Sequence, residues 1–505
     1  MSKNSYTAAD ISIMNDIEHV RARPQMYIGS LTDTGLHHMV QEILSNSSDE
    51  AMNGYGSEIL VTINPNESIT IKDFGRGLPT DIEPTTGLPA AEVLMGHLKA
   101  SGKFGKDNYE FSSGLNGVGA SAVNALSEVF EVEVRRDNSL YKQRFEKGLK
   151  VTEFKKVDKC DGSGTTITFI PDKEVFKDRN TVFNYNNVLE RCEETAYLNS
   201  KISIEVTDTR PKTPLVNKFH FPNGLIDMYN NKTKSLQHIT KEPISVEGTH
   251  LDVPIDLVFG YVSLFADTVA AFVNGVRMPR GGTHVKGFKA ALSRAINVSG
   301  REMGLIKEKD DNFKSDEVIE GLYLIISCRV KEPDFEGQTK NQINNPEAEK
   351  AAYAITLSYL KDYFDDNPAE TQRIINKLFI NRKLKEAQKN AKDQILGKIS
   401  KDILNNITTK LADCSGNKPE LNELFITEGD SASGSLKQMR DRITQAVLGI
   451  KGKILNVEKS TMDKILQNAE IRSIIQSIGA GLGDTFDINN IRYHKVIIAA
   501  DSDSD

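Results

Sequence analysis

Cysteine is scarce in this sequence. The 505 residues include four cysteines, and none lies close to another along the chain, so their spacing predicts neither a disulfide framework nor a zinc knuckle. The four are Cys160, Cys192, Cys328 and Cys414. Long apolar runs are also missing, because no stretch approaches the ~18 residues of a membrane span, and the polar start lacks an apolar signal core. We therefore expect a cytoplasmic protein with no membrane contact.

A strong excess of either charge is missing as well. Seventy acidic residues against 63 basic residues give a net charge of −7, and charged residues make up 26% of the chain. This is ordinary globular composition, which argues against wholesale disorder and against a simple basic coat protein for nucleic acid. At about 150 residues per domain, the length predicts about three domains, each large enough to bury a core.

Two local stretches are nevertheless basic. Residues 373–401 contain nine Lys or Arg against two acids, a net of +7, and residues 436–459 contain six against two, a net of +4. Each stretch is either a solvated charged face or a surface that binds a phosphate backbone.

Hydrophobic periodicity predicts an α/β (α+β) protein. In the first part, residues 36–53 form a predicted helix, and residues 58–63 and 68–73 form a predicted hairpin. Further strands are predicted at 129–135, 140–145 and 165–170, with a long loop over 74–121. A second α/β part is predicted over about 221–395, and its end overlaps a basic helix predicted at 370–401. The last part contains predicted strands at 423–427 and 495–500.

The helix at 36–53 carries a polar stripe opposite its apolar face. Glu42, Asn46, Asp49 and Asn53 share this stripe at about 100° per residue. One interpretation is a solvated face. The other makes Glu42 a general base and Asn46 a ligand of Mg²⁺, because a neutral oxygen donor suits a cation held mainly by phosphates and water.

Asp73 extends a row of side chains that faces the core. Ile69, Ile71 and Asp73 alternate along one strand, and a carboxylate in such a row is costly unless it accepts hydrogen bonds. An adenine amino group is a suitable donor, and the glycines at 75 and 77 permit close approach of a flat ligand. The alternative is an aspartate that opens a turn.

Glycines precede a predicted helix at 120–126. Gly114-Leu115-Asn116-Gly117-Val118-Gly119 would expose backbone N–H groups and a helix N-terminus to phosphate, although the spacing is not that of a dinucleotide fold. Lys103 adds a positive charge on a predicted lid. Gln338 and Lys340, far downstream, would act as donors that let a second domain sense ATP.

Two predicted apolar strands run directly into acidic residues. The strand at 423–427 ends at Glu428, and the strand at 495–500 ends at Asp501, Asp503 and Asp505, which alternate and therefore share one side of an extended chain. Carboxylates at adjacent strand ends favour a hard cation such as Mg²⁺. The alternative is a disordered acidic tail.

These blocks together resemble a known family. Glu42 and Asn46, Asp73 to Gly77, Gly114 to Gly119, and Thr165 resemble the four blocks of the GHKL (gyrase, Hsp90, histidine kinase, MutL) ATPases. The segments at 23–29, 281–284 and 338–340 narrow the resemblance to the B-type subunits of type IIA DNA topoisomerases, as in gyrase and topoisomerase IV. The resemblance covers essentially the whole chain.

The resemblance implies a fold and three domains. Residues 1–220 would form a GHKL (Bergerat) ATPase sandwich with an N-terminal dimerisation arm that includes Tyr6. Residues 221–395 would form a ribosomal S5-like transducer domain. Residues 396–505 would form a linker helix and the first part of a TOPRIM domain.

The resemblance also implies roles for individual residues. Glu42 would polarise the attacking water, Asn46 would ligate Mg²⁺, and Asp73 would read adenine with support from Thr165. The nucleotide would also be bound by the lid, the glycine loop and the second domain, through Gly77, Lys103, Tyr109, Gly114, Leu115, Asn116, Gly117, Val118, Gly119, Gln338 and Lys340. The TOPRIM carboxylates Glu428, Asp501 and Asp503, with Asp505 beside them, would bind Mg²⁺ for DNA cleavage and religation.

The chain departs from the expected pattern of bacterial members at Gln25, Phe74, Asn116 and Ser433. It also ends where a TOPRIM domain is expected to continue, and no winged-helix domain with a nucleophilic tyrosine is recognised. We therefore expect either a shortened chain or a naturally split subunit, and a phage origin. The tyrosine is expected on a partner chain.

The expected function is that of an ATP-dependent type IIA DNA topoisomerase subunit. ATP binding would dimerise the N-terminal domains and trap double-stranded DNA, with an A-type partner subunit completing the enzyme near the nucleoid. One alternative is another GHKL clamp, of the MutL or Hsp90 kind. A second is a non-enzymatic, ATP-dependent dimerisation module that inhibits a host topoisomerase.

Overall fold

The structure is a computed structural model, and it describes most of the chain. The described residues are 14–103, 111–112, 114, 117–176, 181–263, 267–336, 340–405, 410–451, 455–460, 464–465, 468–481 and 486–499, without the side chains of 389–405, 430, 431 and 459. They form two compact units, residues 1–381 and residues 382–505. No helix among the described residues is both long and apolar enough to cross a membrane.

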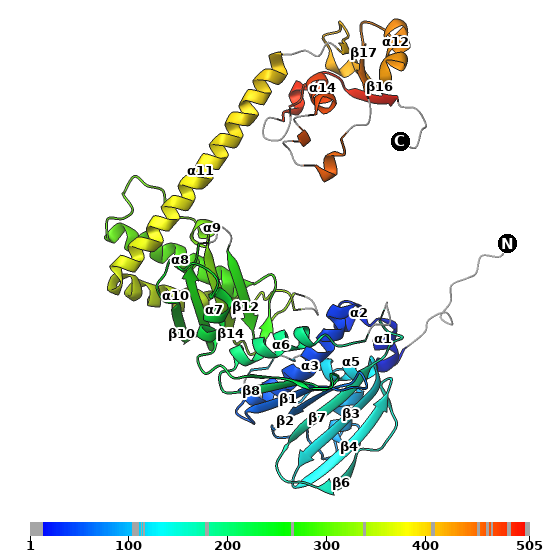
Figure 1. Ribbon diagram of the computed structural model, residues 1–505, viewed down its shortest axis with the longest axis vertical. Coiled ribbons are helices and arrows are strands. Elements are labelled where there is room, and N and C mark those ends of the chain that lie inside the picture. The colour runs from blue at the N-terminus through cyan, green and yellow to red at the C-terminus, as the bar shows by residue number, and fades with distance from the viewer. Residues whose placement is uncertain are drawn as a thin grey trace, which may run out of the picture. The chain divides into compact units, whose positions relative to one another are not determined.

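A mixed sheet of nine described strands lies in the first part of the first unit (Figure 1). Its order is β5-β4-β3-β7-β2-β1-β8-β9, and β6 pairs with β4. The strands are β1 (Glu58–Ile63), β2 (Ile69–Asp73), β3 (Ser127–Arg136), β4 (Ser139–Glu146), β5 (Leu149–Lys150), β6 (Lys155–Lys159), β7 (Gly164–Pro171), β8 (Ser203–Asp208) and β9 (Leu215–Phe219). The predicted hairpin is confirmed, because β1 and β2 pair antiparallel with Ile63 opposite Ile69. The three further predicted strands lie within β3, β4 and β7.

Helices cover one face of this sheet (Figure 1). They are α1 (Asp16–Ala22), α2 (Gln25–Ile28), α3 (Asp33–Met52), α4 (Ala90–Gly96), α5 (Gly119–Ala125) and α6 (Tyr185–Leu198). The long helix α3 packs on β1, β2 and β7 and buries Leu36, Val40 and Ile43 in the core between helix and sheet. The predicted helix at 36–53 is confirmed, with a start three residues earlier. The predicted loop over 74–121 contains α4 and the first turn of α5.

The second part of this unit has its own sheet, in the order β10-β11-β14-β12-β13. Its strands are β10 (Ile244–His250), β11 (Val253–Tyr261), β12 (Thr268–Val273), β13 (Val276–Arg277) and β14 (Leu322–Cys328). The accompanying helices are α7 (Leu225–Thr233), α8 (Thr283–Glu302), α9 (Ser315–Val318) and α10 (Pro346–Asp366). The core lies between the sheet and α8, where Phe259 and Phe288 meet edge to face at 5.2 Å. Pro346 begins α10, where its missing N–H costs no helical hydrogen bond.

Helix α11 (Pro368–Asn405) contains the basic stretch that was predicted to be helical. In the second unit, a sheet has the order β15-β17-β16-β18 among the described strands. Its elements are β15 (Leu411–Ala412), η2 (Pro419–Leu421), β16 (Glu423–Glu428), α12 (Gly429–Met439), β17 (Gln445–Ile450), η3 (Val457–Lys459), α14 (Ala469–Ile478), η5 (Ile488–Asn490) and β18 (Lys495–Ala499). Strand β16 runs parallel to both β17 and β18, which confirms the two predicted strands and makes them neighbours. Their carboxyl ends therefore lie at the same edge of the sheet.

Candidate functional site

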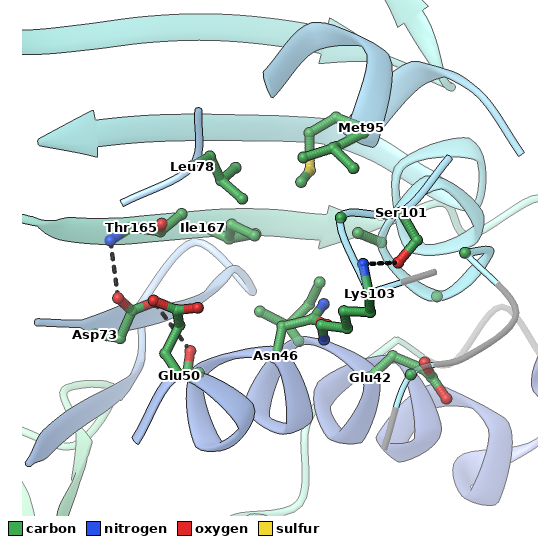
Figure 2. Close-up of a pocket in the computed structure, with 18 of the residues that line it drawn as sticks. Glu42, Asn46, Glu50, Asp73, Leu78, Met95, Ser101, Lys103, Thr165 and Ile167 are labelled. Carbon is green, nitrogen blue, oxygen red and sulfur yellow. Dashed lines mark hydrogen bonds between the residues drawn. The ribbon is translucent and has the colours of Figure 1, made fainter. Parts of the chain in front are cut away.

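A cavity of about 270 Å³ lies between α3 and the first sheet (Figure 2). Helix α3 contributes Glu42, Asn46 and Glu50 to its lining, while β2 and β7 contribute Asp73 and Thr165. Figure 2 shows Leu78, Met95 and Ile167 across the cavity from α3. The result is a slot with apolar walls and a few directed polar groups, which is the usual form of a small-molecule site.

Asp73 lies at one end of this slot, away from Glu42, and its carboxylate is held in place (Figure 2). One carboxylate oxygen accepts hydrogen bonds from the backbone N–H groups of Gly75 and Thr165, each at 3.0 Å, and the other accepts from the Ser47 hydroxyl at 3.2 Å. Burial raises the pKa of Asp73, and these three hydrogen bonds oppose that rise in part. The prediction that Asp73 faces inward is confirmed, since its side of β2 is buried. A hydrogen-bonded carboxylate in an apolar slot is suited to accept from a ligand amino group.

Two glycines permit close approach around the cavity. A Cβ at Gly77 would meet the carbonyl oxygen of Arg135 at 2.6 Å, and its φ of +75° also disfavours other residues. A Cβ at Gly119, the first residue of α5, would lie 2.2 Å from a carboxylate oxygen of Glu42. The glycine loop therefore reaches α3 only because it has no side chain at this point. Gly114, Gly117, Val118 and Gly119 all line the cavity.

Glu42 lies next to a histidine and a lysine. Its Oε1 lies 3.3 Å from His38 Nε2, one helical turn earlier, and 3.9 Å from Lys340 Nζ. Burial raises the pKa of Glu42, but Lys340, His38 and Lys103 together outweigh this effect and lower it to about 2. Glu42 is therefore a carboxylate at neutral pH. Its neighbour Lys340 comes from the part of the chain that forms the second sheet.

Asn46 already contacts a cationic group. Lys103 Nζ donates to Asn46 Oδ1 at 2.7 Å and to Asp49 Oδ2 at 2.6 Å. The side chain of Asp49 is fully buried. The solvated-face interpretation of the α3 stripe is therefore wrong for Asp49, which Lys103 covers. Glu42 and Asn46 are half-buried and line the cavity.

Backbone hydrogen bonds hold Lys340 near the cavity. Arg280 N–H donates to the Asn341 carbonyl at 3.0 Å, and Thr283 N–H donates to the Ile343 carbonyl at 3.2 Å. The Gly281–His284 segment, which was singled out in the sequence, thus fastens the chain after Lys340 to the start of α8. His284 is buried there, and burial lowers its pKa to about 3. Lys340 itself is 9% exposed.

Glu428 lies at the carboxyl end of β16 and is exposed. Because Thr427 is opposite Ala499 in the parallel β16–β18 pair, residues that follow Ala499 begin at the same sheet edge. No group of three or more His, Cys, Asp or Glu that could hold a metal is found within the described ranges. The other predicted acidic ligands, Asp501, Asp503 and Asp505, fall outside those ranges. The same is true of the arm residue Tyr6 and of four candidates for the nucleotide site, which are Tyr109, Leu115, Asn116 and Gln338.

Sequence reasoning missed several contacts in and beside the cavity. His38 was detectable, because it is four residues before Glu42 and so lies on the same helical face. Two ion pairs could not have been found from the spacing of residues in the sequence. They are the buried Lys103–Asp49 pair and the Glu50–Arg76 pair, in which Arg76 Nη2 lies 2.8 Å from Glu50 Oε1. Each joins segments more than 25 residues apart, so only folding brings them together.

The fold and cavity define a class of ATPase. The family described as histidine kinase-, DNA gyrase B-, and HSP90-like ATPase matches residues 32–175, the region that forms the cavity apart from Lys340. The family described as DNA gyrase B matches residues 224–394, and the Toprim domain matches residues 423–505. The last two matches separate this chain from the chaperone and mismatch-repair clamps.

Whole-chain comparisons narrow the class further. The DNA gyrase B protein of Halalkalibacterium halodurans is 41% identical over 503 residues, which are 100% of this chain and 78% of that protein. The B-type subunit of the type 2 topoisomerase of Aquifex aeolicus is 40% identical over 99% of this chain and 62% of that protein. The 43K ATPase domain of Thermus thermophilus gyrase B, solved with an aminocoumarin, has a TM-score of 0.61 at 32% identity, covering 75% of this chain and 98% of that domain.

This chain belongs to the DNA gyrase B family of type IIA topoisomerase subunits. It is an ATP-hydrolysing subunit of an ATP-dependent type IIA DNA topoisomerase, and its ATPase and Toprim domains imply the use of a nucleotide and Mg²⁺. The relatives named above are bacterial, so the phage origin stays a prediction.

Proposed function

We propose that the cavity binds ATP and that Glu42 activates the water that attacks the γ-phosphate. The observation that carries this proposal is the meeting of Glu42, on α3, and Lys340, between β14 and α10, with 3.9 Å between Oε1 and Nζ. A carboxylate can orient and polarise water, while a lysine can bind the transferred phosphoryl group as a point charge. Lys340 would exchange its ion pair with Glu42 for the γ-phosphate.

The adenine end of the nucleotide would lie at Asp73. The free electron pairs of its carboxylate would accept from the exocyclic amino group, and the Thr165 backbone would keep the carboxylate oriented. Leu78, Met95 and Ile167 would pack on the ring. Gly77 and the loop from Gly114 to Gly119, with Leu115, Asn116 and Val118, would wrap the ring edge and the phosphates, and Lys103, Tyr109 and Gln338 would add donors.

Asn46 would hold the Mg²⁺ that accompanies ATP. Its amide oxygen already accepts from the Lys103 ammonium group beside the buried Asp49, so the position suits a positive charge. Bound there, Mg²⁺ would neutralise the phosphate oxygens. Lys103 would then move from Asn46 towards the phosphates.

A second Mg²⁺ site would form at the edge of the Toprim sheet. Glu428, Asp501 and Asp503, with Asp505 beside them, would supply oxygen ligands, which fits the parallel pairing of β16 with β18. The metal would assist cleavage and religation of DNA by a tyrosine on an A-type partner subunit.

These sites would operate together in a clamp with three domains, over residues 1–220, 221–395 and 396–505. ATP binding would dimerise the first domains through an N-terminal arm that includes Tyr6, and the dimer would trap one DNA duplex. The domain that carries Lys340 would relay the nucleotide state along α11, whose basic residues suit the DNA backbone. Such a subunit would work in the cytoplasm at the nucleoid.

The decisive experiment combines this chain with an A-type subunit and supercoiled plasmid DNA. We expect a change in DNA topology only when both chains, ATP and Mg²⁺ are present. Omission of ATP and use of either chain alone are the controls. Strand breakage by this chain alone would contradict the placement of the nucleophile on a partner, and ATP-driven dimerisation without hydrolysis would favour a non-enzymatic module.

A further inference from the structure

The backbone of residues 111 and 112 is held from two sides. This segment directly precedes the glycine loop that begins at Gly114. Asn53, just after α3, donates its side-chain N–H to the Phe111 carbonyl at 3.2 Å. On the other side, Arg329 follows β14 of the second sheet, and its guanidinium lies over the Phe111 ring at 5.9 Å, within the range of a cation–π contact.

Asn274 makes the closest of these contacts. Its side-chain N–H group donates to the Ser112 carbonyl at 2.7 Å and to the Val330 carbonyl at 2.8 Å, and its side-chain oxygen accepts from Val330 N–H at 2.8 Å. Asn274 is fully buried and Ser112 is 4% exposed. One side chain therefore joins the backbone before the glycine loop to the backbone that continues from β14 towards Lys340.

The local turn alone does not account for an asparagine here. Asn274 and Gly275 form the two-residue turn between β12 and β13, with φ values of +49° and +77°. Such turns favour asparagine or glycine at both positions. Asn138 occupies a similar turn between β3 and β4 with a φ of +54°, yet its side chain is exposed. Asn274 differs because its amide is buried against two backbone segments.

We propose that Asn274 is a positioning residue that couples the phosphate-binding loop to the part of the chain that carries Lys340. This inference rests on the proposed function of the cavity. ATP would engage the glycine loop and, through its γ-phosphate, Lys340. ADP would engage the loop alone. A fixed connection between the two segments lowers the free-energy cost of binding one nucleotide to both of them. Asn274 therefore favours ATP over ADP.

The test measures the affinities of the full chain for ADP and for a non-hydrolysable ATP analogue by titration calorimetry. In Asn274→Gly, which retains the turn but loses the side-chain hydrogen bonds, we expect the analogue to bind about fivefold more weakly, and ADP to change by less than about twofold. Asn274→Asp should have a larger effect on the analogue, because its carboxylate would face the Ser112 and Val330 carbonyls. Asn138→Gly is the matched control and should change neither affinity.

The Lys340→Ala background separates coupling from a purely structural role. Without Lys340, Asn274→Gly should leave the ratio of the two affinities unchanged. Partial unfolding of a variant lowers the number of binding sites and not this ratio, so the measurement stays decisive for a less stable variant. Equal weakening of both nucleotides, no weakening, or an effect that persists without Lys340 would each overturn the inference while the proposed function stands. Failure of the unaltered chain to bind either nucleotide would overturn both.

Discussion

In the cavity beside α3, polar side chains are buried or half-buried and hydrogen-bonded to neighbouring groups, whereas Glu428 at the end of β16 is exposed. Asp73 accepts three hydrogen bonds and Lys103 bridges Asn46 and Asp49, so this chain sets their positions before any ligand arrives. Such preorganisation suits a site that works on a small, mobile substrate. The Toprim edge instead offers a solvated carboxylate, which suits a site that DNA, metal and a partner chain would complete.

The largest effect that this comparison predicts concerns Glu42. Replacing it by alanine removes the carboxylate that would activate water, so we expect ATP hydrolysis to fall on the order of 10³-fold, with nucleotide binding retained. Steady-state hydrolysis and calorimetric binding measure the two quantities. Gln41→Ala, a neighbour on α3 outside the cavity lining, is the control. Near-normal turnover in Glu42→Ala would refute the role of Glu42.

A second prediction concerns the acid stability of the cavity. The pKa of Glu42 is lowered to about 2 from an ordinary 4.5, so its ion pairs favour the folded chain by roughly 3 kcal/mol above the ordinary pKa. This stabilisation is lost as pH falls from 4.5 towards 2. The difference in unfolding free energy between the unaltered chain and Glu42→Gln should therefore shrink between pH 6 and pH 3.5. A constant difference in denaturant titrations would show that the pairs do not stabilise the nucleotide-free protein.

The third prediction tests whether Asp73 reads the base. In Asp73→Asn, one oxygen can still accept from Gly75 and Thr165, but an N–H group replaces the other acceptor. Loss of a hydrogen bond to a charged group should weaken ATP binding roughly 30-fold. Guanosine triphosphate serves as the comparison ligand, and its weaker binding should change much less. An equal loss for both nucleotides would indicate a general distortion of the slot.

The smallest expected effect is the change in ATP hydrolysis on substitution of Glu428, and it tests the contrast between the two regions. Glu428→Gln removes a charge from the Toprim edge, and Glu428 is not among the residues that line the cavity, so ATP hydrolysis should change by less than about twofold. With the A-type partner and DNA present, Mg²⁺-dependent cleavage should be lost. Gel assays of cleavage and hydrolysis assays on the same preparation measure both. Normal cleavage would remove Glu428 from the metal site.

The sequence predicted the local elements and many residues of the cavity. Strand alternation around Ile69, Ile71 and Asp73 and the apolar face of α3 survive in the structure, because each depends on the side-chain period of one element. The glycines were also predicted, since Gly77 and Gly119 lie where a Cβ would collide with a neighbour. The polar stripe of α3 remained ambiguous, because its burial depends on a segment some 50 residues away.

What the sequence by itself determined is thus the set of elements, the family resemblance and the chemistry of single motifs. Only the tertiary structure decided which of these groups meet. It buried Asp49 under Lys103, brought Lys340 to Glu42 across almost 300 residues, and joined Ser112 to Asn274. The physical reason is that local patterns reflect one helix or strand, whereas these pairs depend on how two sheets and their loops pack in three dimensions.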